Sequence, residues 1–298
     1  MEKKMNGTLV SEVLYDELVQ YLTVKQAQPL KIVDISVGND FGGEMYANMK
    51  KRKLEKLGKY LVESRHFDSI STGELINVIK NINDDEQIDG VMLQLPLPKE
   101  NSNFEREILD TIAWNKDVDG LTTSSIGRLV VGSDCLEPCT PKGIVALLKA
   151  YGVDLLGKRV CIINRSNIVG KPLEQLFLKE NSTTTLCHSK TDNLDDICRS
   201  ADIVVAAMSK PEMITRDYIS ENSVVVDVGV HKNAEGKTVG DVSYDDVYPV
   251  ASLITPPVGG VGPMTICMLA YNTAKARYGR EVEEILNKGI EKAKVLVK

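Results

Sequence analysis

A tyrosine and a lysine four residues apart, Tyr46 and Lys50, form a pair whose types and spacing suggest chemistry. In a helix they would lie on one face, one above the other. A lysine near a tyrosine in a partly dry cleft loses its proton more readily than a solvated one, so Lys50 could act as a base near neutral pH. Alternatively, Tyr46 is a core aromatic residue and Lys50 is one solvated member of a basic run: Lys50, Lys51, Arg52, Lys53, Lys56 and Lys59.

Two further polar residues follow at places where a sheet would present them. A strand-like run over 90–95 ends near Gln94 and is closed by two prolines, and Asp119 precedes a glycine in a turn over 116–120. Ligands of open α/β sheets collect beyond the carboxyl ends of the strands. Gln94 could hold a lysine without fixing it as an ammonium, and Asp119 could accept hydrogen bonds from an amino-heterocycle. The alternative for Gln94 is a cap on its own strand end.

A loop over 255–265 carries three glycines and three prolines between a strand-like segment and an amphipathic helix. Glycine lets backbone amides approach a ligand closely, and proline restricts the path of the chain. The helix that follows offers free N–H groups to a polar partner. We expect this loop to contact a ligand; the alternative is an ordinary strand-to-helix turn.

A second candidate site follows the strand over 159–163. The segment 164–172 leads into a helix, with Gly170 where the helix starts and Pro172 at an early helical position, and it is not a G-x-G-x-x-G motif. The next strand ends in His188, Ser189 and Lys190, where an NAD-preferring fold tends to place an acid. With Arg165 nearby, this corner would suit the 2′-phosphate of NADP; the alternative is an exposed polar turn.

The alternation of strands and helices predicts parallel sheets covered by helices on both faces. We expect strands over 30–37, 90–95, 159–163, 183–187, 203–207, 224–228 and 253–254, and helices over 43–58, 74–82, 105–111, 143–151, 264–278 and 281–297. The predicted fold is a two-domain α/β protein with a cleft between a first α/β domain and a Rossmann-like domain. A boundary is expected near residues 138–141.

The composition excludes several classes of protein. A net charge of −6 argues against a surface that binds nucleic acid, and no run approaches the ~20 apolar residues of a membrane span. The six cysteines include no C-x-x-C pair, and the first residues show no apolar signal region. We therefore expect a cytoplasmic protein with reduced, buried cysteines. The three histidines are not at ligand spacing, so no metal site is expected.

Taken in order, the motifs resemble those of the bifunctional methylenetetrahydrofolate dehydrogenase/methenyltetrahydrofolate cyclohydrolase family over nearly the whole chain. Nine motifs carry this resemblance. Any one of them is weak evidence for the family, but nine in the right order are specific evidence. They are Tyr46-x-x-x-Lys50, Gln94-Leu95-Pro96-Leu97-Pro98, residues 116–120, residues 138–143, Arg165-Ser166-x-Ile168-Val169-Gly170-x-Pro172, residues 187–191, Asp227-Val228-Gly229, Gly240-Asp241-Val242 and residues 259–265.

The resemblance implies a fold and two activities. It implies oxidation of 5,10-methylenetetrahydrofolate with NADP, followed by hydrolysis of the methenyl product to 10-formyltetrahydrofolate. A folate domain would take residues 1–138 and 270–298, and an NADP domain residues 139–269. The family is usually a homodimer, paired through its cofactor domains. Its substrates are tetrahydrofolate derivatives.

The resemblance also implies residue roles. Lys50 would be the essential residue of the cyclohydrolase step, Tyr46 would stack on or position the folate, Gln94 would tune Lys50, and Asp119 would bind the pterin. Further folate contacts are implied at Leu95, Pro257, Gly259, Gly260 and Val261. Arg165 and Ser189 would contact the 2′-phosphate. The cofactor contacts expected in all are Thr140, Asn164, Arg165, Ser166, Val169, Gly170, Pro172, His188, Ser189, Ala207, Ser209, Val228, Gly229 and Val230.

The chain departs from the family pattern at several positions, none of which removes a proposed catalytic group. A Ser-Gln pair is usual where this chain has Gly43-Glu44, so the charge around Lys50 could differ. Glycine is usual at Asn164 and Ser209, and asparagine at Ser125; the usual Pro-Val-Pro order is altered over 256–258. Three alternatives stay open: a dehydrogenase without useful cyclohydrolase activity, a non-catalytic folate- or nucleotide-binding protein, and another two-domain dehydrogenase of the shikimate type.

Overall fold

The computed structural model describes residues 3–38 and 41–297, and for residues 41–44 it describes the backbone alone. The chain divides into two compact units. The first comprises Met1–Leu14, Thr140–Cys267 and Lys288–Lys298, and the second comprises Tyr15–Cys139 and Met268–Asn287. The predicted division of function, 1–138 with 270–298 for folate and 139–269 for NADP, stays a prediction.

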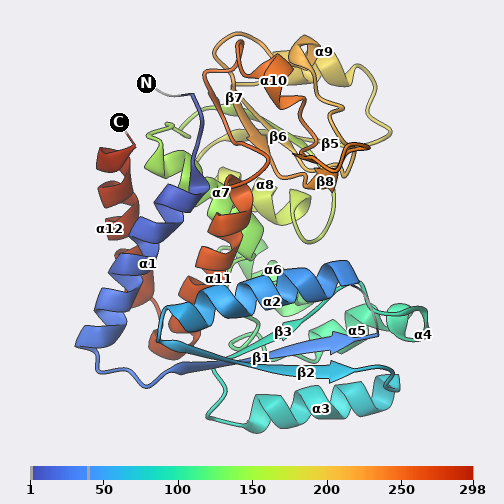
Figure 1. Cartoon of the computed structure of the whole chain (residues 1–298), viewed down its shortest axis with the longest axis vertical. Coiled ribbons are helices and arrows are strands. Elements are labelled where there is room, and N and C mark those ends of the chain that lie inside the picture. Colours follow the sequence, from blue (N-terminus) through green and yellow to red (C-terminus); the bar gives the residue numbers. More distant parts are fainter. Residues whose placement is uncertain (1–2, 39–40, 298) are drawn as a thin grey trace. The chain divides into compact units, whose positions relative to one another are not determined.

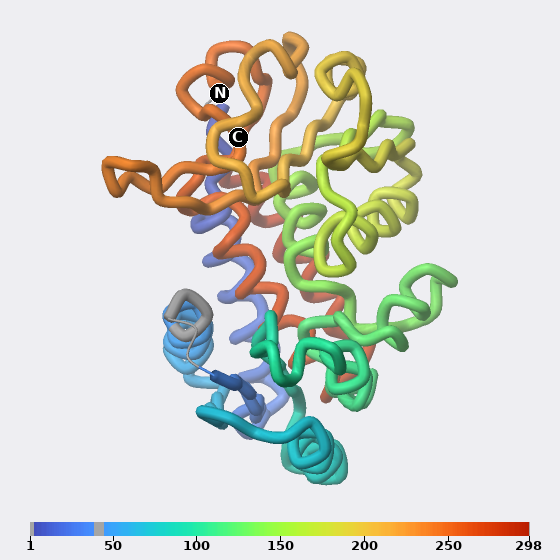
Figure 2. Tube along the Cα trace, turned by 90° about the vertical axis from the view of Figure 1, so that its right-hand side faces the viewer, coloured from blue at the N-terminus to red at the C-terminus, as the bar shows by residue number. Residues whose placement is uncertain are grey.

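The second unit contains a parallel sheet of three strands in the order β2 (Tyr60–Phe67), β1 (Leu30–Val37), β3 (Gly90–Leu93). Helices α2 (Phe41–Lys56) and α3 (Thr72–Asp84) lie on opposite faces of it (Figures 1 and 2). Side chains alternate between the faces of a strand. Val33, Ile35 and Val37 of β1 therefore pack with α3 in one hydrophobic cluster, and the even-numbered residues point to the other face.

Strand β2 is absent from the sequence-based prediction. Only Tyr60 and Val62 are buried in it, and its second half is polar, with Glu63, Arg65 and His66. It is an edge strand, and an edge strand needs no continuous apolar run, so the apolar pattern that identifies β1 is weak here. Three short helices complete the segment after β3: α4 (Lys99–Ser102), α5 (Glu105–Asp110) and α6 (Thr123–Val130).

The first unit contains a parallel sheet of five strands in the order β10-β7-β6-β4-β5. Strand β5 follows β4 on one side and β6 returns on the other, so the strand order reverses between β4 and β6. In open α/β sheets such a reversal marks the ligand-binding crevice. The strands are β4 (Arg159–Ile163), β5 (Thr183–Cys187), β6 (Ile203–Ala206), β7 (Val224–Asp227) and β10 (Leu253–Ile254).

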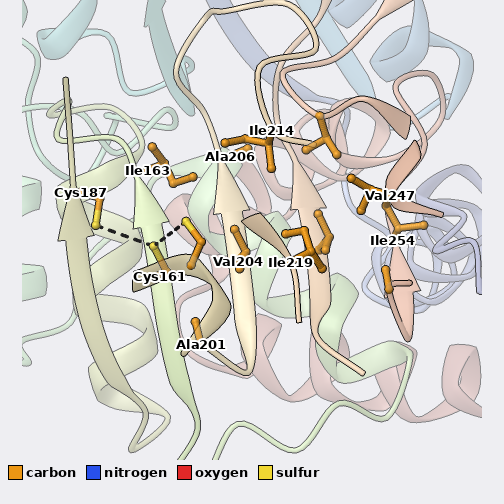
Figure 3. Packing of buried hydrophobic residues seen from close by; sticks show 14 residues of the cluster. Cys161, Ile163, Cys187, Ala201, Val204, Ala206, Ile214, Ile219, Val247 and Ile254 are labelled. Atoms are coloured by element: carbon orange, nitrogen blue, oxygen red, sulfur yellow. Dashed lines mark hydrogen bonds between the residues drawn. The ribbon is translucent and has the colours of Figure 1, made fainter. Parts of the chain in front are cut away.

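One face of this sheet carries an apolar core drawn in Figure 3. The sulfur of Cys161 lies 3.7 Å from that of Cys187 and 3.6 Å from that of Cys198, as thiols in hydrogen-bond contact. All six cysteines are free and buried, which confirms the prediction of reduced core residues. Short helices α9 (Leu194–Arg199) and α10 (Tyr244–Val247) contribute to this cluster.

Helices lie near 143–151, 264–278 and 281–297, as predicted, with shifted ends, whereas helix α1 (Gly7–Val24) was not predicted. Helix α11 begins inside the glycine-proline loop, three residues before the predicted start. The bounds are α1 (Gly7–Val24), α7 (Cys139–Ala150), α8 (Gly170–Lys179), α11 (Val261–Tyr278) and α12 (Glu281–Leu296); a turn η1 (Arg216–Tyr218) and a hairpin of β8 (His231–Lys232) and β9 (Thr238–Val239) complete the chain. None of the helices described is long and apolar enough to cross a bilayer. The α/β fold with parallel sheets is confirmed.

Candidate active site

Lys50 is the buried member of its basic run. Its side chain is 6% exposed, whereas the other lysines and the arginine of the run are half-buried or exposed. Helix α2 turns it onto the side that packs on the sheet, and the apolar Leu54 lies one turn later on the same side. Within the described residues, no carboxylate forms an ion pair with Lys50. The interpretation of Lys50 as a solvated lysine is therefore wrong.

Tyr46 lies beside Lys50, as the four-residue spacing predicts. The ammonium of Lys50 is 5.1 Å from the centroid of the Tyr46 ring, within the range of a cation–π interaction. The residue is 36% exposed, so Tyr46 is not a core residue. Burial of the hydroxyl raises the pKa of Tyr46, and the nearby Asp119 raises it further. The phenol is therefore neutral at physiological pH and presents a ring face rather than a base.

Gln94 follows the last residue of β3, and its backbone N–H donates to Ile35 of β1 at 2.8 Å. Its carbonyl Oε1 accepts from the ammonium of Lys50 at 3.4 Å. Its amide Nε2 donates to a carboxylate oxygen of Asp34 at 2.6 Å. Gln94 thus connects Lys50 with a buried acid that the sequence-based prediction did not include. Leu95 packs against the apolar core on the α3 side of the sheet.

In the turn over 116–120, every side chain except that of Asp119 contacts other parts of the protein. Lys116 donates to three carbonyls at the end of α3 at 2.6–3.1 Å. Asp117 accepts from the N–H groups of residues 121 and 122, and Val118 is buried. Gly120 has φ of +71°, and a Cβ there would lie 2.6 Å from a backbone oxygen. Among the described residues, Asp119 has no hydrogen-bond partner, so its carboxylate is available to a ligand.

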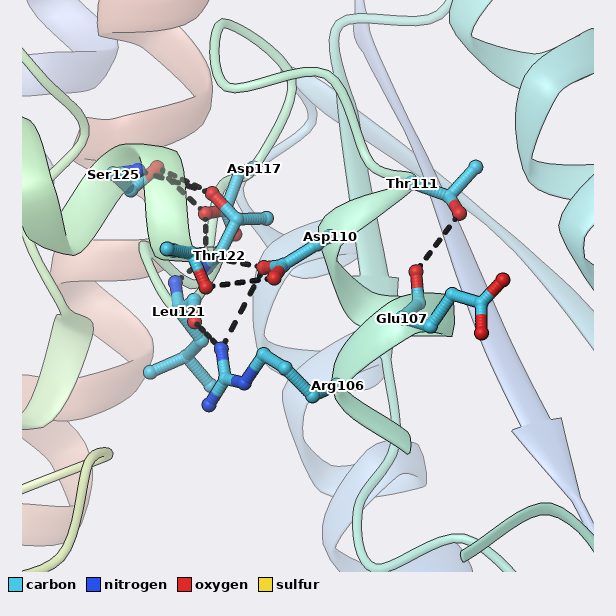
Figure 4. Close-up of polar contacts among 9 residues, drawn as sticks. Arg106, Glu107, Asp110, Thr111, Asp117, Leu121, Thr122 and Ser125 are labelled. Carbon is cyan, nitrogen blue, oxygen red and sulfur yellow. Dashed lines mark hydrogen bonds and ion pairs between the residues drawn. The ribbon is translucent and has the colours of Figure 1, made fainter. Parts of the chain in front are cut away.

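Two acids hold the segment that follows this turn. Asp117 also accepts from the hydroxyl of Ser125 at 2.7 Å, and Figure 4 shows these side chains and Thr122 pointing toward one another. Asp110 accepts from the N–H and hydroxyl of Thr123 at 2.6 Å. Ser125, where the family usually has asparagine, therefore has a structural role in this chain. The network fixes the backbone that carries Asp119.

The electrostatics of Asp119 are unusual for a surface turn. Burial raises the pKa of its carboxyl, Lys50 acts in the opposite direction, and the neighbouring Asp117 and Asp34 raise it further. Asp119 and Tyr46 therefore both have a raised pKa, and they lie beside the buried Lys50. Shifted pKa values in neighbouring side chains are typical of a functional site.

In the first unit, the loops after β4 and β6 meet at the switch point. Asn164 donates through Nδ2 to the carbonyl of Ala207. Its Oδ1 accepts from the N–H groups of Ser166 at 2.7 Å and Gly170 at 3.0 Å. The asparagine that replaces a usual glycine thus ties the start of α8 to the β6 loop. The N–H of Gly170, an expected cofactor contact, is therefore used inside the protein.

Helix α8 begins at Gly170, as predicted, with Val169 as its N-cap and Pro172 buried in its first turn. Arg165 is exposed, and within the described residues its guanidinium has no ion pair. Ser189 and Lys190 are also exposed, while Nδ1 of His188 accepts from the N–H of Lys190 at 3.1 Å. The basic and hydroxyl groups at this corner are therefore accessible to a phosphate.

Two buried carboxylates shape the other loops at this edge of the sheet. Asp241 accepts from the N–H groups of residues 208, 209 and 210 at 2.7–3.2 Å and contacts Nε2 of His231 at 2.8 Å. Asp227 accepts from the N–H groups of Gly229, Asp241 and residue 242 at 2.9–3.0 Å. Burial raises the pKa of Asp227 to about 6. These hydrogen bonds hold the loop that contains Val228, Gly229 and Val230, which are expected to contact the cofactor.

Ser209 occupies a backbone conformation that suits glycine. Its φ is +56°, in the left-handed region that costs a residue with a Cβ about 1–2 kcal/mol. The resemblance places a usual glycine at this position, and the backbone geometry gives the physical reason for that preference. Ser209 is exposed, so its hydroxyl is not needed for packing.

The glycine-proline loop belongs to the first unit and is partly explained by its own packing. Gly259 has φ of +81° and its carbonyl accepts from the N–H of Thr8 at 3.1 Å. A Cβ on Gly260 would lie 2.5 Å from a carbonyl oxygen of the same loop. Thr140 shares a hydroxyl hydrogen bond with Thr265 at 3.0 Å. Nothing in these contacts requires a ligand, so the folate roles of Pro257, Gly259, Gly260 and Val261 stay predictions.

The side chains of Gly43 and Glu44 lie outside those described, so their predicted influence on Lys50 stays a prediction. Among the described residues, no group of three or more histidines, cysteines or acids could hold a metal ion.

The fold and the sites define an α/β enzyme with a dinucleotide-type sheet and a separate lysine-containing site. Family models match both parts of the chain. The catalytic domain of tetrahydrofolate dehydrogenase/cyclohydrolase matches residues 5–119, and the NAD(P)-binding domain of the same family matches residues 138–280. The chain is also similar to the bifunctional protein FolD of Agathobacter rectalis, with 41% identity over 93% of this chain and 99% of that protein.

Solved structures agree. The bifunctional FolD methylenetetrahydrofolate dehydrogenase/cyclohydrolase of Campylobacter jejuni has a TM-score of 0.86 and 36% identity, covering 91% of this chain and 97% of that chain. The Trypanosoma brucei methylenetetrahydrofolate dehydrogenase-cyclohydrolase, solved with NADP and an inhibitor, has a TM-score of 0.82 and 28% identity, covering 93% and 96%.

The chain belongs to the tetrahydrofolate dehydrogenase/cyclohydrolase family. The predicted resemblance and the pairing of dehydrogenase with cyclohydrolase activity in one-carbon metabolism are confirmed. The prediction of a nicotinamide dinucleotide cofactor is confirmed by the matched NAD(P)-binding domain, and a relative solved with NADP supports NADP.

Proposed function

We propose that Lys50 carries the proton transfers of the cyclohydrolase step. The observation that supports this is its burial against a neutral amide, with Gln94 at 3.4 Å and no ion pair to a carboxylate among the described residues. A carboxylate partner would hold the lysine as an ammonium, whereas an amide carbonyl accepts a hydrogen bond from the protonated and the neutral amine alike. Lys50 can therefore change its charge during a turnover.

The hydrolysis needs a proton acceptor and a proton donor in turn. Water adds to the methenyl carbon of 5,10-methenyltetrahydrofolate as Lys50 takes a proton from it. The bond from that carbon to N5 then breaks, N5 receives a proton, and the carbon becomes the formyl group on N10. One proton is released overall. General acid–base catalysis of this kind typically contributes about 10²–10⁴-fold.

We assign the binding of the pterin to Asp119 and Tyr46. Asp119 is the side chain of its turn without a hydrogen-bond partner among the described residues, so its carboxylate can accept from the pterin amino group and a ring N–H. The Tyr46 ring is partly exposed and its phenol stays neutral, which suits stacking on the pterin. Gln94 holds Lys50 at the reacting atoms.

The residues at the β4/β6 switch point fit a dinucleotide. The order of the strands and the exposed Arg165 and Ser189 provide a corner that suits a 2′-phosphate. When bound, NADP would accept the hydride that leaves the methylene carbon of the folate. The folate nitrogens supply the electrons, so the protein needs no base there and acts by holding the two rings together.

Two further assignments, the oligomeric state and the cellular location, complete the proposal. We propose a homodimer, because the family resemblance implies pairing through the cofactor domains and β5 leaves one edge of the five-stranded sheet open. We propose a cytoplasmic location, because six free cysteines fit a reducing compartment. Sedimentation of the purified chain at micromolar concentration tests the first, since a monomer there would contradict it.

A single-cuvette absorbance assay tests the function itself. Methylenetetrahydrofolate is mixed with enzyme and either NADP or NAD, and the methenyl chromophore is followed. We expect it to form faster with NADP and to decay in a second, enzyme-dependent phase. Formation without an enzyme-dependent decay would remove the cyclohydrolase assignment, and faster formation with NAD would remove the cofactor assignment.

A further inference from the structure

Asp34 occupies a place where a strand ordinarily carries an apolar side chain. It is the fifth of eight residues of β1, the central strand of its sheet, and is 4% exposed. Its neighbours Val33 and Ile35 pack in the core on the α3 side, so the alternation of side chains directs Asp34 to the opposite face. Burying a carboxylate is costly unless its oxygens receive hydrogen bonds. Such a residue calls for a specific role.

The contact that Asp34 makes is directed at the proposed catalytic lysine. Its Oδ1 accepts from Nε2 of Gln94 at 2.6 Å, and the other end of the same amide accepts from Lys50 at 3.4 Å. An ionised carboxylate can only accept hydrogen bonds. It therefore selects one of the two orientations of the amide, the one with the NH₂ group toward β1 and the carbonyl toward Lys50.

We propose that Asp34 is a positioning residue for the cyclohydrolase step: by fixing the Gln94 amide, it keeps a carbonyl rather than an NH₂ group facing Lys50. This inference rests on the proposed function of Lys50. Without Asp34 the amide could rotate, its NH₂ group would face an ammonium that also only donates, and Lys50 would lose its partner. The amide also separates the two charges, so Asp34 supports Lys50 without holding it as a salt bridge.

The test is a double-mutant cycle read in the hydrolysis of methenyltetrahydrofolate. We expect Asp34→Val to lower kcat about tenfold, the effect of losing one oriented hydrogen bond, while KM changes less than about twofold. Asp34→Asn should retain most of the rate, because its Oδ1 can still accept from Gln94. In the Gln94→Ala background, Asp34→Val should cause no further loss, since residues that act through one another are non-additive.

Asp89 provides a matched control. It is a buried carboxylate at the other end of β3, where it accepts from the N–H of Lys31 and pairs with Arg277. Asp89→Asn should change thermal stability without changing kcat. If Asp34→Val does not fold, Asp34→Ala takes its place. Losses that add in the Gln94→Ala background, or an Asp34→Asn variant as slow as Asp34→Val, would overturn the inference.

Lys50→Met is measured in the same series to separate two failures. If Lys50→Met still hydrolyses methenyltetrahydrofolate at the parent rate, the proposed role of Lys50 is wrong, and the inference falls with it. If Lys50→Met is inactive while Asp34→Val matches the parent, only the role of Asp34 is wrong.

Discussion

The two units of this chain use buried polar groups in opposite ways. In the second unit, the polar groups around the ends of β1 and β3 are side chains that contact one another, from Asp34 through Gln94 to Lys50. In the first unit, the buried acids Asp227 and Asp241 accept mostly from backbone N–H groups and hold loops in place. A lysine that must exchange protons needs a partner that allows both charge states, whereas a loop that must hold a dinucleotide needs a fixed backbone.

The largest effect that this comparison predicts is at Lys50. In Lys50→Met the hydrolysis of methenyltetrahydrofolate should fall by about 10²–10⁴-fold, because the proton carrier is lost while the volume of the side chain is nearly kept. Folate should still bind. Lys51→Met is the matched control, since Lys51 contacts the hydroxyl of Ser64 in the same helix-to-strand region. Initial rates, corrected for hydrolysis in buffer, are the measurement. Equal losses in the two variants would show that Lys50 has no special role.

The second prediction concerns the structural acid of the first unit. The pKa of Asp227 is raised from 3.8 to about 6 by burial, so the folded state keeps a proton that the unfolded state has lost between these values. The contribution is complete below pH 4 and is lost as pH rises to 6. Over that window the parent should lose on the order of 2–3 kcal/mol of unfolding free energy relative to Asp227→Asn.

Urea unfolding of parent and Asp227→Asn at pH 4, 5, 6 and 7 measures this difference. The exposed Asp245→Asn serves as the control and should give curves parallel to the parent. A constant gap between Asp227→Asn and the parent across the window would contradict the assignment of the raised pKa to Asp227.

The third prediction concerns the pterin site. Asp119→Ala should weaken folate binding by about 1.5–3 kcal/mol, the value of a hydrogen bond to a charged group, and should lower both activities together. Titration of tetrahydrofolate by calorimetry gives the dissociation constant. Asp68→Ala, a change at an exposed carboxylate in the same unit, should leave it unchanged. Unaltered binding in Asp119→Ala would remove Asp119 from the site.

The fourth prediction concerns the choice of cofactor. Arg165→Ala should weaken NADP binding by about 1.5–3 kcal/mol and NAD binding far less, because only NADP carries the 2′-phosphate. Direct binding of both cofactors and kcat/KM for each decide it, with Lys237→Ala as an exposed control in the same unit. Equal losses for NADP and NAD would show that Arg165 contacts the shared part of the cofactor, or nothing.

The smallest effect is expected at Ser209. Because its φ of +56° suits glycine, Ser209→Gly should raise the unfolding free energy by about 1 kcal/mol. Denaturant unfolding measures this change. A destabilised variant would mean that the serine hydroxyl contributes more than the backbone strain costs.

The two sites also differ in how far they could be predicted from the sequence. The four-residue spacing of Tyr46 and Lys50 could be interpreted from the sequence because helix geometry alone brings the two side chains together. Asp34 was missed, although an acid inside an otherwise apolar strand is a signal that could have identified it. Its partner Gln94 lies 60 residues away, and only the strand register brings them together.

The loops of the first unit were harder to interpret from the sequence. The segment 164–172 fits no simple glycine pattern, and the hydrogen bonds of Asn164 depend on the β6 loop meeting the β4 loop. Asp227 and Asp241 belong to quoted motifs, but most of the hydrogen bonds by which they hold backbone N–H groups join residues 14 positions apart or more. Strand β2 was missed because its polar half hides the apolar pattern.

The central claim is that the hydride step needs no protein base and the hydrolysis needs Lys50. The most direct measurement is a full progress curve of Lys50→Met with methylenetetrahydrofolate and NADP in one cuvette. We predict that the methenyl chromophore rises, accumulates close to the amount of NADPH formed, and then decays only at the rate of buffer hydrolysis. A chromophore that rises and decays as in the parent, or that never forms although folate and NADP both bind, would contradict this account.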